Sequence, residues 1–418
     1  MLKQIEGSRA VAEAVGLCRP EVICAYPISP QTHIVEGCAE LIRSGAIENC
    51  EFINVESEFA ALSVAIGASA AGARSYTATA SQGLLFMAEA VYNAAGLGLP
   101  IVMTVGNRAI GAPINIWNDW SDSMSARDAG WVQLFVESNQ QAVDVHIQAF
   151  RLAEELSVPV MVCMDGFILT HSYTRIDLPD QSRVDAFLPP FQPRQVLDPA
   201  SPLTIGAMVG PEAFTEVRFL AHYHLLQALE RIPEHAREFE AIFGRDSGGL
   251  VKSHGAEGAE TVVVTMGSVI GTMKSVLEEM RAEGESIGAL TIRAFRPFPR
   301  EALREALKDA KRVIVVEKSL ALGMGGILGA DLRMALNDMP VRVHSAIAGL
   351  GGRPITRDNL RRMFLKGIND DMEEPHFHDV RMDVVERELA RQAAQRLSGA
   401  AAANILKDLG AVSAAKTA

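Results

Sequence analysis

The sequence predicts an α/β protein with two parallel-sheet domains and a helical C-terminal tail. Short apolar runs alternate with helical patterns from residue 21 to about residue 166, and the same alternation resumes at residue 261. An Ala-rich amphipathic pattern then covers residues 383–409. We expect the first domain over residues 1–172, a linker with a helix over 173–258, the second domain over 259–366, and a loop and helical tail over 367–418.

Composition excludes several classes of protein. The chain has 418 residues, 48% of them hydrophobic and 22% charged, which is ordinary for a globular protein. Its net charge is −12 and its Lys and Arg residues are scattered, so we expect no nucleic-acid partner. No signal peptide or membrane span is evident, which predicts a cytoplasmic protein without membrane contact. The five cysteines form no Cys-x-x-Cys pair and favour buried thiols over disulfides, zinc or iron–sulfur ligation.

The first domain is organised around one βαβ unit. Residues 52–55 and 76–80 read as strands, and the small-residue segment 58–72 between them reads as a helix. Ser81 then caps the next helix. Glu58 falls in the first helical turn, at the carboxyl edge of the sheet, where open α/β sheets bind ligands. The simpler interpretation of Glu58 is an acid that complements the helix dipole.

The neighbouring elements strengthen the functional interpretation. Residues 7–15, 32–44, 81–93 and 142–156 read as helices, and residues 21–25, 101–105 and 158–164 read as strands. Four successive strands end in polar or rigid groups: Tyr26-Pro27-Ile28-Ser29-Pro30, residues 56–58, Ser81-Gln82 and Asn107-Arg108. The prolines make a stiff turn that holds the Ser29 hydroxyl. Parallel strands end at one edge, so these groups predict a shared site.

A long polar loop follows at residues 109–131. It contains Asn115 and all three tryptophans, Trp117, Trp120 and Trp131. Such a loop beside a sheet edge is typical of a binding loop or a subunit contact. The alternative is a structured surface loop that buries its own aromatic side chains.

The rest of the chain offers two weaker signals. The proline-rich linker contains a polar helix at 212–243, and the second domain reads as strands at 261–266, 288–293 and 312–317 with helices at 269–283 and 301–310. A glycine-rich turn at 323–329 invites a dinucleotide interpretation, but no acidic ribose partner follows at the expected distance. The cluster Glu373, Glu374, His376, His378 and Asp379 has metal-like composition, yet Pro375 prevents a helical ligand face and favours a solvated loop.

Taken together, the motifs resemble a known family. They are Tyr26 to Pro30, Glu56 to Glu58, Ala80 to Leu85, Gly106 to Ala109, Asn115 to Asp119, Arg127-Asp128, Asp165 to Phe167, Thr265 to Ser268, Arg296 to Phe298 and Ala348 to Gly352. In this order they resemble the alpha subunit of the pyruvate:ferredoxin oxidoreductase family, thiamine-diphosphate-dependent 2-oxoacid:acceptor oxidoreductases. The resemblance covers about residues 5 to 365. It implies a three-layer pyrimidine-binding domain followed by a transketolase C-terminal-like domain.

The resemblance also implies residue roles. Glu58 matches the carboxyl that bonds the aminopyrimidine of thiamine diphosphate, and Arg108 matches the arginine that binds the substrate carboxylate. Ser29 stands where a threonine is usual and keeps its hydroxyl. Cofactor contacts are expected from Tyr26, Pro27, Ile28, Glu58, Ser81 and Gln82, and substrate contacts from Ser29, Arg108, Asn115 and Trp120.

Other parts of the enzyme must come from partner subunits. The sequence has no Gly-Asp-Gly with a following Asn, which relatives use for magnesium and the diphosphate, and no cysteine set for a cluster. The resemblance therefore implies a beta subunit with the diphosphate motif, iron–sulfur subunits, coenzyme A, and ferredoxin or NAD as acceptor through those subunits. We expect no metal ligands in this chain and an active site at a subunit interface.

One position bears on the substrate. Pyruvate-type relatives commonly have His where this chain has Trp120, so an aryl 2-oxoacid such as phenylglyoxylate and pyruvate both stay open. If Trp120 faces a neighbouring subunit instead, it says nothing about the substrate. A split thiamine enzyme of the transketolase or decarboxylase type, and a non-catalytic assembly subunit, are the alternative functions.

Overall fold

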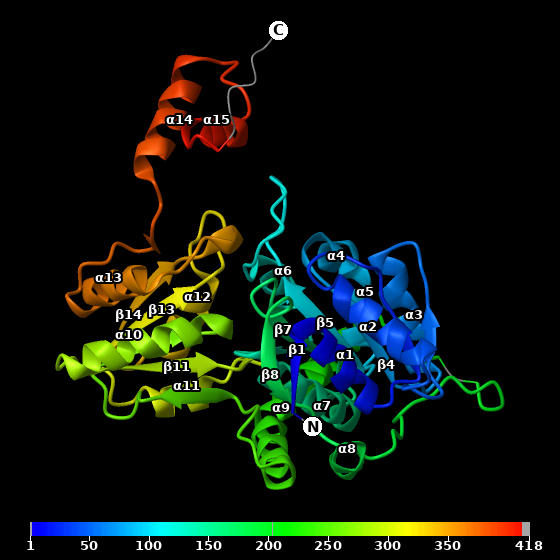
Figure 1. Cartoon of the computed structure of the whole chain (residues 1–418). Helices are drawn as coiled ribbons and strands as arrows, with labels where there is room; N and C mark the ends of the chain where they lie inside the picture. The colour runs from blue at the N-terminus through cyan, green and yellow to red at the C-terminus, as the bar shows by residue number, and fades with distance from the viewer. Residues whose placement is uncertain (1, 203, 412–418) are drawn as a thin grey trace.

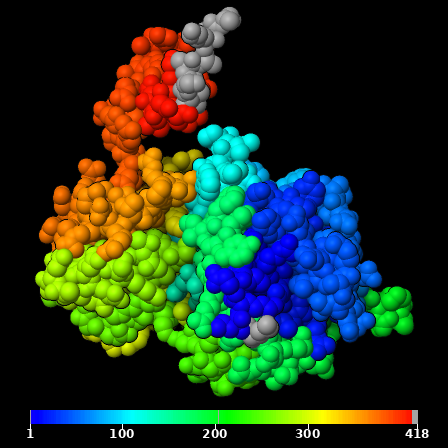
Figure 2. All heavy atoms as spheres, viewed as in Figure 1, coloured from blue at the N-terminus to red at the C-terminus, as the bar shows by residue number. Residues whose placement is uncertain are grey.

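The computed structural model describes residues 2–202 and 204–411. Two α/β domains lie side by side, with the C-terminal helices standing apart from both (Figure 1). The space-filling view shows the same arrangement, in which the tail meets the body through a narrow segment (Figure 2).

The first domain is built on a seven-stranded sheet. All its strands are parallel except β12, which runs antiparallel to β6. In spatial order the strands are β12 (Ala294–Arg296), β6 (Val132–Phe135), β7 (Val160–Asp165), β5 (Ile101–Asn107), β4 (Ser75–Thr79), β2 (Val22–Cys24) and β3 (Glu51–Ile53). The central strands are buried along their whole length, which explains their continuous apolar runs.

Helices cover both faces of this sheet. One face packs against α1 (Gly7–Leu17), α2 (Thr32–Arg43) and α7 (Asn139–Leu156). The other packs against α3 (Glu58–Ala70), α4 (Ser81–Phe86) and α5 (Ala88–Gly96), and a short helix, α6 (Ser121–Ser125), lies in the loop after β5. The expected helix at 81–93 is thus two helices that meet at Met87.

The segment expected as a linker packs on the first domain. Strand β8 (Tyr173–Asp177) pairs antiparallel with β1 (Leu2–Glu6), a two-stranded sheet that the sequence did not indicate. Helix α8 (Gln181–Phe187) follows, and the expected helix is α9 (Phe214–Phe243), whose buried residues join the core around α7. The first structural unit therefore extends beyond residue 172.

The second domain is built on a six-stranded sheet. Its strands in spatial order are β15 (His376–Phe377), β14 (Arg342–Ile347), β13 (Arg312–Glu317), β10 (Thr261–Thr265), β11 (Ile287–Ile292) and the antiparallel β9 (Val251–His254). Helices α10 (Ile270–Ala282) and α13 (Arg357–Ile368) cover one face, and α11 (Arg300–Ala306) and α12 (Ile327–Ala335) cover the other, with 3₁₀ turns at Gly267–Val269 and Leu350–Gly352.

The acidic and histidine-rich segment 373–379 is not a free solvated loop as expected. His376 and Phe377 form the edge strand β15 beside β14, and the Glu374 carboxylate accepts a hydrogen bond of 3.1 Å from the Ser345 backbone N–H. This segment therefore packs as the edge strand of the second sheet, and Glu374 hydrogen-bonds to the neighbouring strand.

The two domains share a core and a sheet. One hydrophobic cluster includes Leu62 of α3, Phe135 of β6 and Leu332 of α12. In addition, β12 comes from the second-domain part of the chain but pairs with β6 of the first sheet. Burial on both sides of the junction therefore fixes how the domains sit together.

The tail forms two helices rather than one. Helix α14 (Met382–Ala394) and helix α15 (Ala401–Asp408) are separated by a turn in which Gly399 has φ of 85°. Arg391 of α14 pairs with Asp408 of α15 at 3.0 Å, which holds them as a hairpin. Among the described residues, no helix is both long enough and apolar enough to cross a membrane.

Candidate functional site

The four strand ends singled out in the sequence are neighbours in space. Strands β3, β2, β4 and β5 lie in this order in the first sheet, and all are parallel. Their carboxyl ends therefore open at the same edge, as their alternation with helices predicts.

Glu58 is the first residue of α3. Ser57 caps this helix, because its hydroxyl accepts a 3.2 Å hydrogen bond from the Ala60 N–H. The Glu58 side chain lies directly over Gly83, where an added Cβ would be only 2.8 Å from Glu58 Oε1. Glu58 is 8% exposed, yet its carboxyl receives no hydrogen bond from the described residues. A nearly buried carboxylate without an internal partner is suited to a ligand.

Arg108 joins two further expected residues. Its Nη1 donates to the Ser29 carbonyl at 2.9 Å, and its Nε donates to the Asn115 carbonyl at 3.1 Å. Its Nη2 makes no hydrogen bond within the described residues, so one face of the guanidinium stays available. Partial burial lowers the pKa of Arg108 from its ordinary value, although the nearby Asp122 charge opposes this shift. Two of the guanidinium nitrogens of Arg108 are therefore held by the protein, and Nη2 is left for a ligand.

Ser29 and its turn form the exposed rim of the edge. Tyr26, Pro27 and Ser29 are exposed and Ile28 is half-buried. The Ser29 hydroxyl makes no hydrogen bond in the described part of the chain, while Gln31 behind it donates to the Tyr26 carbonyl at 2.8 Å and holds the turn.

Ser81 faces inward rather than toward the edge. It is fully buried, has φ of 49°, and its hydroxyl donates to the Ala109 carbonyl at 2.5 Å. Gln82 is half-buried, and an added Cβ at Gly111 would lie 2.6 Å from Gln82 Nε2. Ser81 therefore holds the loop after β5, and only Gln82 of this pair has access to the edge.

Asp122 organises the site and was missed in the sequence. This fully buried carboxylate accepts 2.9 Å hydrogen bonds from the backbone N–H groups of Ser81 and Arg108, and another from the Asn107 side chain. Burial raises its pKa to about 6, although these hydrogen bonds oppose the shift. It ties the β4 end to the β5 end. No residue pattern distinguishes it from the other acids of its loop.

Trp120 does not line a pocket or a subunit surface, and this corrects the sequence hypothesis. Its side chain is fully buried, its Nε1 donates to Asp165 Oδ1 at 2.9 Å, and its ring packs edge-on against Phe135 at 5.9 Å. Trp131 is buried too, whereas Trp117 is 53% exposed. The loop thus buries two of its own aromatic side chains, the interpretation that the sequence left as an alternative.

Asp165 makes the junction between the domains. Lys318 of the second domain donates to Asp165 Oδ2 at 3.0 Å, and the Ser268 backbone N–H donates to the same oxygen at 2.9 Å. Burial opposes ionisation of Asp165, but the Lys318 charge and the hydrogen bonds outweigh it and lower the pKa. Asn115 also contributes to this junction, because its Nδ2 donates to the Gly351 carbonyl at 3.1 Å.

The glycine-rich turn before α12 is closed by the protein itself. The Glu317 carboxylate accepts hydrogen bonds from the backbone N–H groups of Leu328 and Gly329 at 2.8 and 3.0 Å. An added Cβ at Gly326 would lie 2.0 Å from Glu317 Oε1. The helix N-terminus, where a dinucleotide phosphate would bind, therefore already carries an internal carboxylate.

The edge fits one half of a thiamine-diphosphate site. The unpartnered Glu58 carboxylate could hydrogen-bond an aminopyrimidine ring nitrogen, and the missing Cβ of Gly83 makes room for the Glu58 side chain itself.

Comparisons with known proteins identify the family of the chain. Residues 13–241 match the family model described as "Pyruvate flavodoxin/ferredoxin oxidoreductase, thiamine diP-bdg", and residues 259–360 match "Pyruvate:ferredoxin oxidoreductase core domain II". The chain therefore belongs to the pyruvate flavodoxin/ferredoxin oxidoreductase family, and its first domain is of the thiamine-diphosphate-binding type.

The chain is an alpha-type subunit of a 2-oxoacid:ferredoxin oxidoreductase. It is 49% identical over 364 residues to the pyruvate synthase subunit PorA of Methanosarcina barkeri, covering 86% of this chain and 90% of that one. It is also 41% identical over 374 residues to the ketoisovalerate oxidoreductase subunit VorA of Pyrococcus abyssi, covering 88% and 93%. Nothing among these relatives supports a phenylglyoxylate-type enzyme.

Solved structures share the fold. A 2-oxoglutarate:ferredoxin oxidoreductase from Magnetococcus marinus, solved with 2-oxoglutarate, coenzyme A and succinyl-CoA bound, superposes with a TM-score of 0.67 at 21% identity, covering 88% of this chain and 65% of that one. A split-gene transketolase, described as an inactive beta4 tetramer, has a TM-score of 0.51 at 13% identity, covering 88% and 99%. Both likenesses concern the fold alone.

Proposed function

We propose that this chain is the alpha subunit of an enzyme that oxidatively decarboxylates pyruvate to acetyl-CoA and CO2, and that it contributes the pyrimidine and substrate-carboxylate side of the active site. One observation carries the proposal: two groups suited to the chemistry occur at the same sheet edge. The Glu58 carboxylate has no hydrogen-bond partner among the described residues, and the Arg108 guanidinium is held by two hydrogen bonds. Its relatives named as pyruvate synthase subunits support pyruvate as the substrate.

Thiamine diphosphate, when bound, supplies the carbon nucleophile that 2-oxoacid decarboxylation needs. Glu58 would hold a hydrogen bond at the ring nitrogen of the aminopyrimidine and so set its proton position. Arg108 would bind the 2-oxoacid carboxylate through Nη2, and the Ser29 hydroxyl would donate to the substrate from the adjacent rim. Asp122 keeps Arg108 in place from behind.

The chain needs partners for the rest of the reaction. The sequence has no Gly-Asp-Gly with a following Asn and no cysteine set for a cluster, so we place magnesium and the diphosphate on a beta subunit and the iron–sulfur clusters on further subunits. Coenzyme A is the acyl acceptor, and ferredoxin or NAD takes the electrons through those subunits. The exposed rim residues Tyr26 and Phe59 and the exposed Ile114 and Trp117 of the loop after β5 give this edge apolar surface for such a partner.

A branched 2-oxoacid is the second candidate substrate, because the chain also resembles the ketoisovalerate oxidoreductase subunit over 88% of its length. The transketolase alternative receives only a fold-level likeness. An assembly subunit without catalytic groups does not fit, because Glu58 and Arg108 both lie at the edge.

The test is turnover of the purified native complex with coenzyme A and a viologen dye. Pyruvate, 2-oxoisovalerate, 2-oxoglutarate and phenylglyoxylate are compared as substrates at equal concentrations. We expect the highest kcat/KM with pyruvate. A preference for 2-oxoisovalerate would select the second candidate, and no turnover with any 2-oxoacid would contradict the proposed activity.

A further inference from the structure

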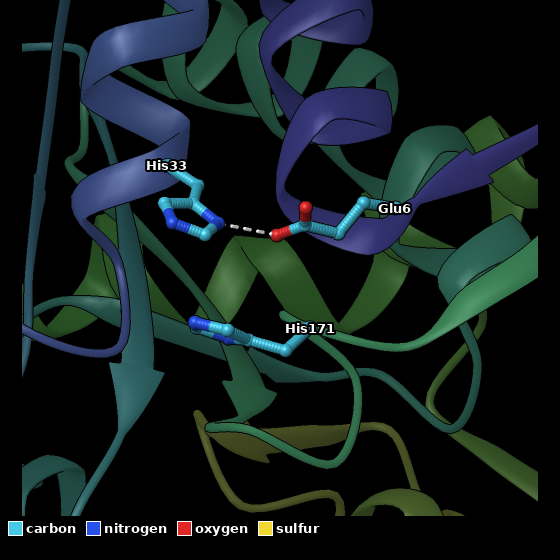
Figure 3. Close-up of side chains that lie close together, drawn as sticks. All are labelled: Glu6, His33 and His171. Carbon is cyan, nitrogen blue, oxygen red and sulfur yellow. Dashed lines mark hydrogen bonds and ion pairs between the residues drawn. The ribbon is translucent and has the colours of Figure 1, made fainter.

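Three potential metal ligands that the proposed function does not use lie together beside the first sheet. They are Glu6 at the end of β1, His33 in the first turn of α2, and His171 in the loop after β7. Their nearest ligand atoms all lie within 4.8 Å of one another. Figure 3 shows the Glu6 carboxylate and the His171 ring both beside the His33 ring.

The backbone fixes two of these residues before any ion binds. The Gly7 N–H donates to the Ser172 carbonyl at 3.1 Å, and the Ser8 N–H donates to the Thr170 carbonyl at 2.9 Å. These bonds hold the chain at Glu6 against the chain at His171. A site whose ligands come from segments already fixed to each other loses little conformational freedom on binding.

In each of the two histidine rings, Nδ1 has a polar partner. His171 Nδ1 lies 2.8 Å from Thr170 Oγ1, which also accepts a 2.8 Å hydrogen bond from the Phe167 N–H. Because Nδ1 contacts Thr170, Nε2 of His171 is the nitrogen left to bind a metal ion. A second hydrogen bond of this kind commonly supports histidine ligands in metal sites. His33 Nδ1 lies 2.6 Å from Glu6 Oε1, and the His33 side chain is 41% exposed, so it can rotate to admit an ion.

The chemistry of the donors selects the class of ion. Two imidazoles and one carboxylate form the set that binds zinc and similar divalent ions at about 2.0 to 2.2 Å, with water in the fourth position. Such ligands stand about 3 to 3.5 Å apart around a tetrahedral ion. The present set, whose ligand atoms lie within 4.8 Å of one another, would reach that spacing by rotation of the side chains. Lys3 and Arg9, the nearest cations in the sequence, are already paired with Glu13 and Glu40.

We propose that Glu6, His33 and His171 bind one divalent transition-metal ion per chain, with Zn²⁺ as the best fit. The ion would join the β1 end, the α2 start and the loop after β7. Because α2 begins three residues after Ser29, it would also stiffen the Tyr26 to Pro30 turn. The proposal does not depend on the identity of the substrate.

The test is Zn²⁺ binding by the purified complex after chelator treatment and dialysis, measured by equilibrium dialysis with elemental analysis. We expect one Zn²⁺ per copy of this chain above the metal held by other subunits. His171→Ala should weaken this binding by at least about tenfold. His222→Ala, which removes an exposed histidine of α9, is the matched control and should bind like the wild type.

Thermal unfolding provides the second measurement. Zn²⁺ should raise the Tm of the wild type and of His222→Ala, because an ion that binds only the folded state stabilises it. Glu6→Gln keeps a hydrogen-bond acceptor for His33 but loses the charge, so it should fold and show a smaller Zn²⁺ shift. Equal Zn²⁺ binding by wild type, His171→Ala and Glu6→Gln would overturn the proposal, as would loss of binding only in His376→Ala.

Discussion

Two polar regions of this chain look alike in sequence and differ in structure. At the sheet edge, the Glu58 carboxylate, the Ser29 hydroxyl and Arg108 Nη2 have no partner among the described residues. At the domain junction, Asp165, Lys318, Asn118 and Trp120 satisfy one another through hydrogen bonds of 2.9 to 3.1 Å. Unsatisfied groups near a surface point to a ligand, whereas a closed network points to folding. Substitutions in the two regions should therefore separate turnover from stability.

The largest effect is expected from Glu58→Gln. Turnover should fall by about 10² to 10⁴ because the residue that sets a proton position is lost. The free energy of unfolding should barely change, since the carboxyl has no internal hydrogen bond. Glu56→Gln, an exposed acid of the same loop, is the control and should keep full activity. Dye reduction and thermal unfolding measure the two quantities, and an active Glu58→Gln enzyme would remove this residue from the site.

Asp165→Asn should show the opposite pattern. It leaves the buried Lys318 ammonium without its counter-charge, which costs about 3 kcal/mol of folding free energy. Chemical denaturation of the full chain measures this loss. Complexes that still assemble should turn over at a nearly normal rate per active site. A stable Asp165→Asn chain with low turnover would show that the junction is part of the catalytic machinery.

Arg108→Lys tests the substrate-carboxylate role. Lysine keeps the charge but loses the planar guanidinium, which is worth about 1.5 to 3 kcal/mol in charged hydrogen bonds. We expect kcat/KM for the 2-oxoacid to fall by about 10- to 100-fold, which is that energy converted to a rate ratio. The KM for coenzyme A should stay constant. Equal losses for both substrates would indicate a general disturbance of the edge.

The smallest effect is expected from Trp120→Phe. This change removes one hydrogen bond to Asp165 and some packing, with a cost of about 1 to 3 kcal/mol. The ratio of kcat/KM values for pyruvate and phenylglyoxylate should not change, because the side chain is fully buried. A shift of that ratio would show that Trp120 takes part in substrate selection.

The sequence was sufficient to predict features that depend on the residues of one strand or helix and its ends. The strand ends were predicted to converge, and β3, β2, β4 and β5 are indeed neighbours. Glu58 reaches that edge because it opens α3, and Arg108 because it follows directly on β5. Ser29 reaches it through the proline-flanked turn between β2 and α2. The long helix of the expected linker was also confirmed as α9.

Features that depend on distant pairing could not be predicted. Ser81 follows a strand like the others but turns inward, because Asp122, Ala109 and its own backbone conformation hold it there. Trp120 was expected to face the substrate pocket or a neighbouring subunit because relatives commonly have His there, whereas Lys318 and Asp165 from distant parts of the chain pack against it and bury it. Glu6, His33 and His171 are too far apart in sequence to form a motif.

Strand β12 also has a consequence for how the chain is made. β6 is an edge strand of the first sheet until Ala294–Arg296 pairs with it. During synthesis the N-terminal part of a protein folds first, and an unpaired strand edge can join another chain. The nascent first domain therefore exposes β6 until β10, α10 and β11 of the second domain have all been made, and β12 then protects that edge from aggregation.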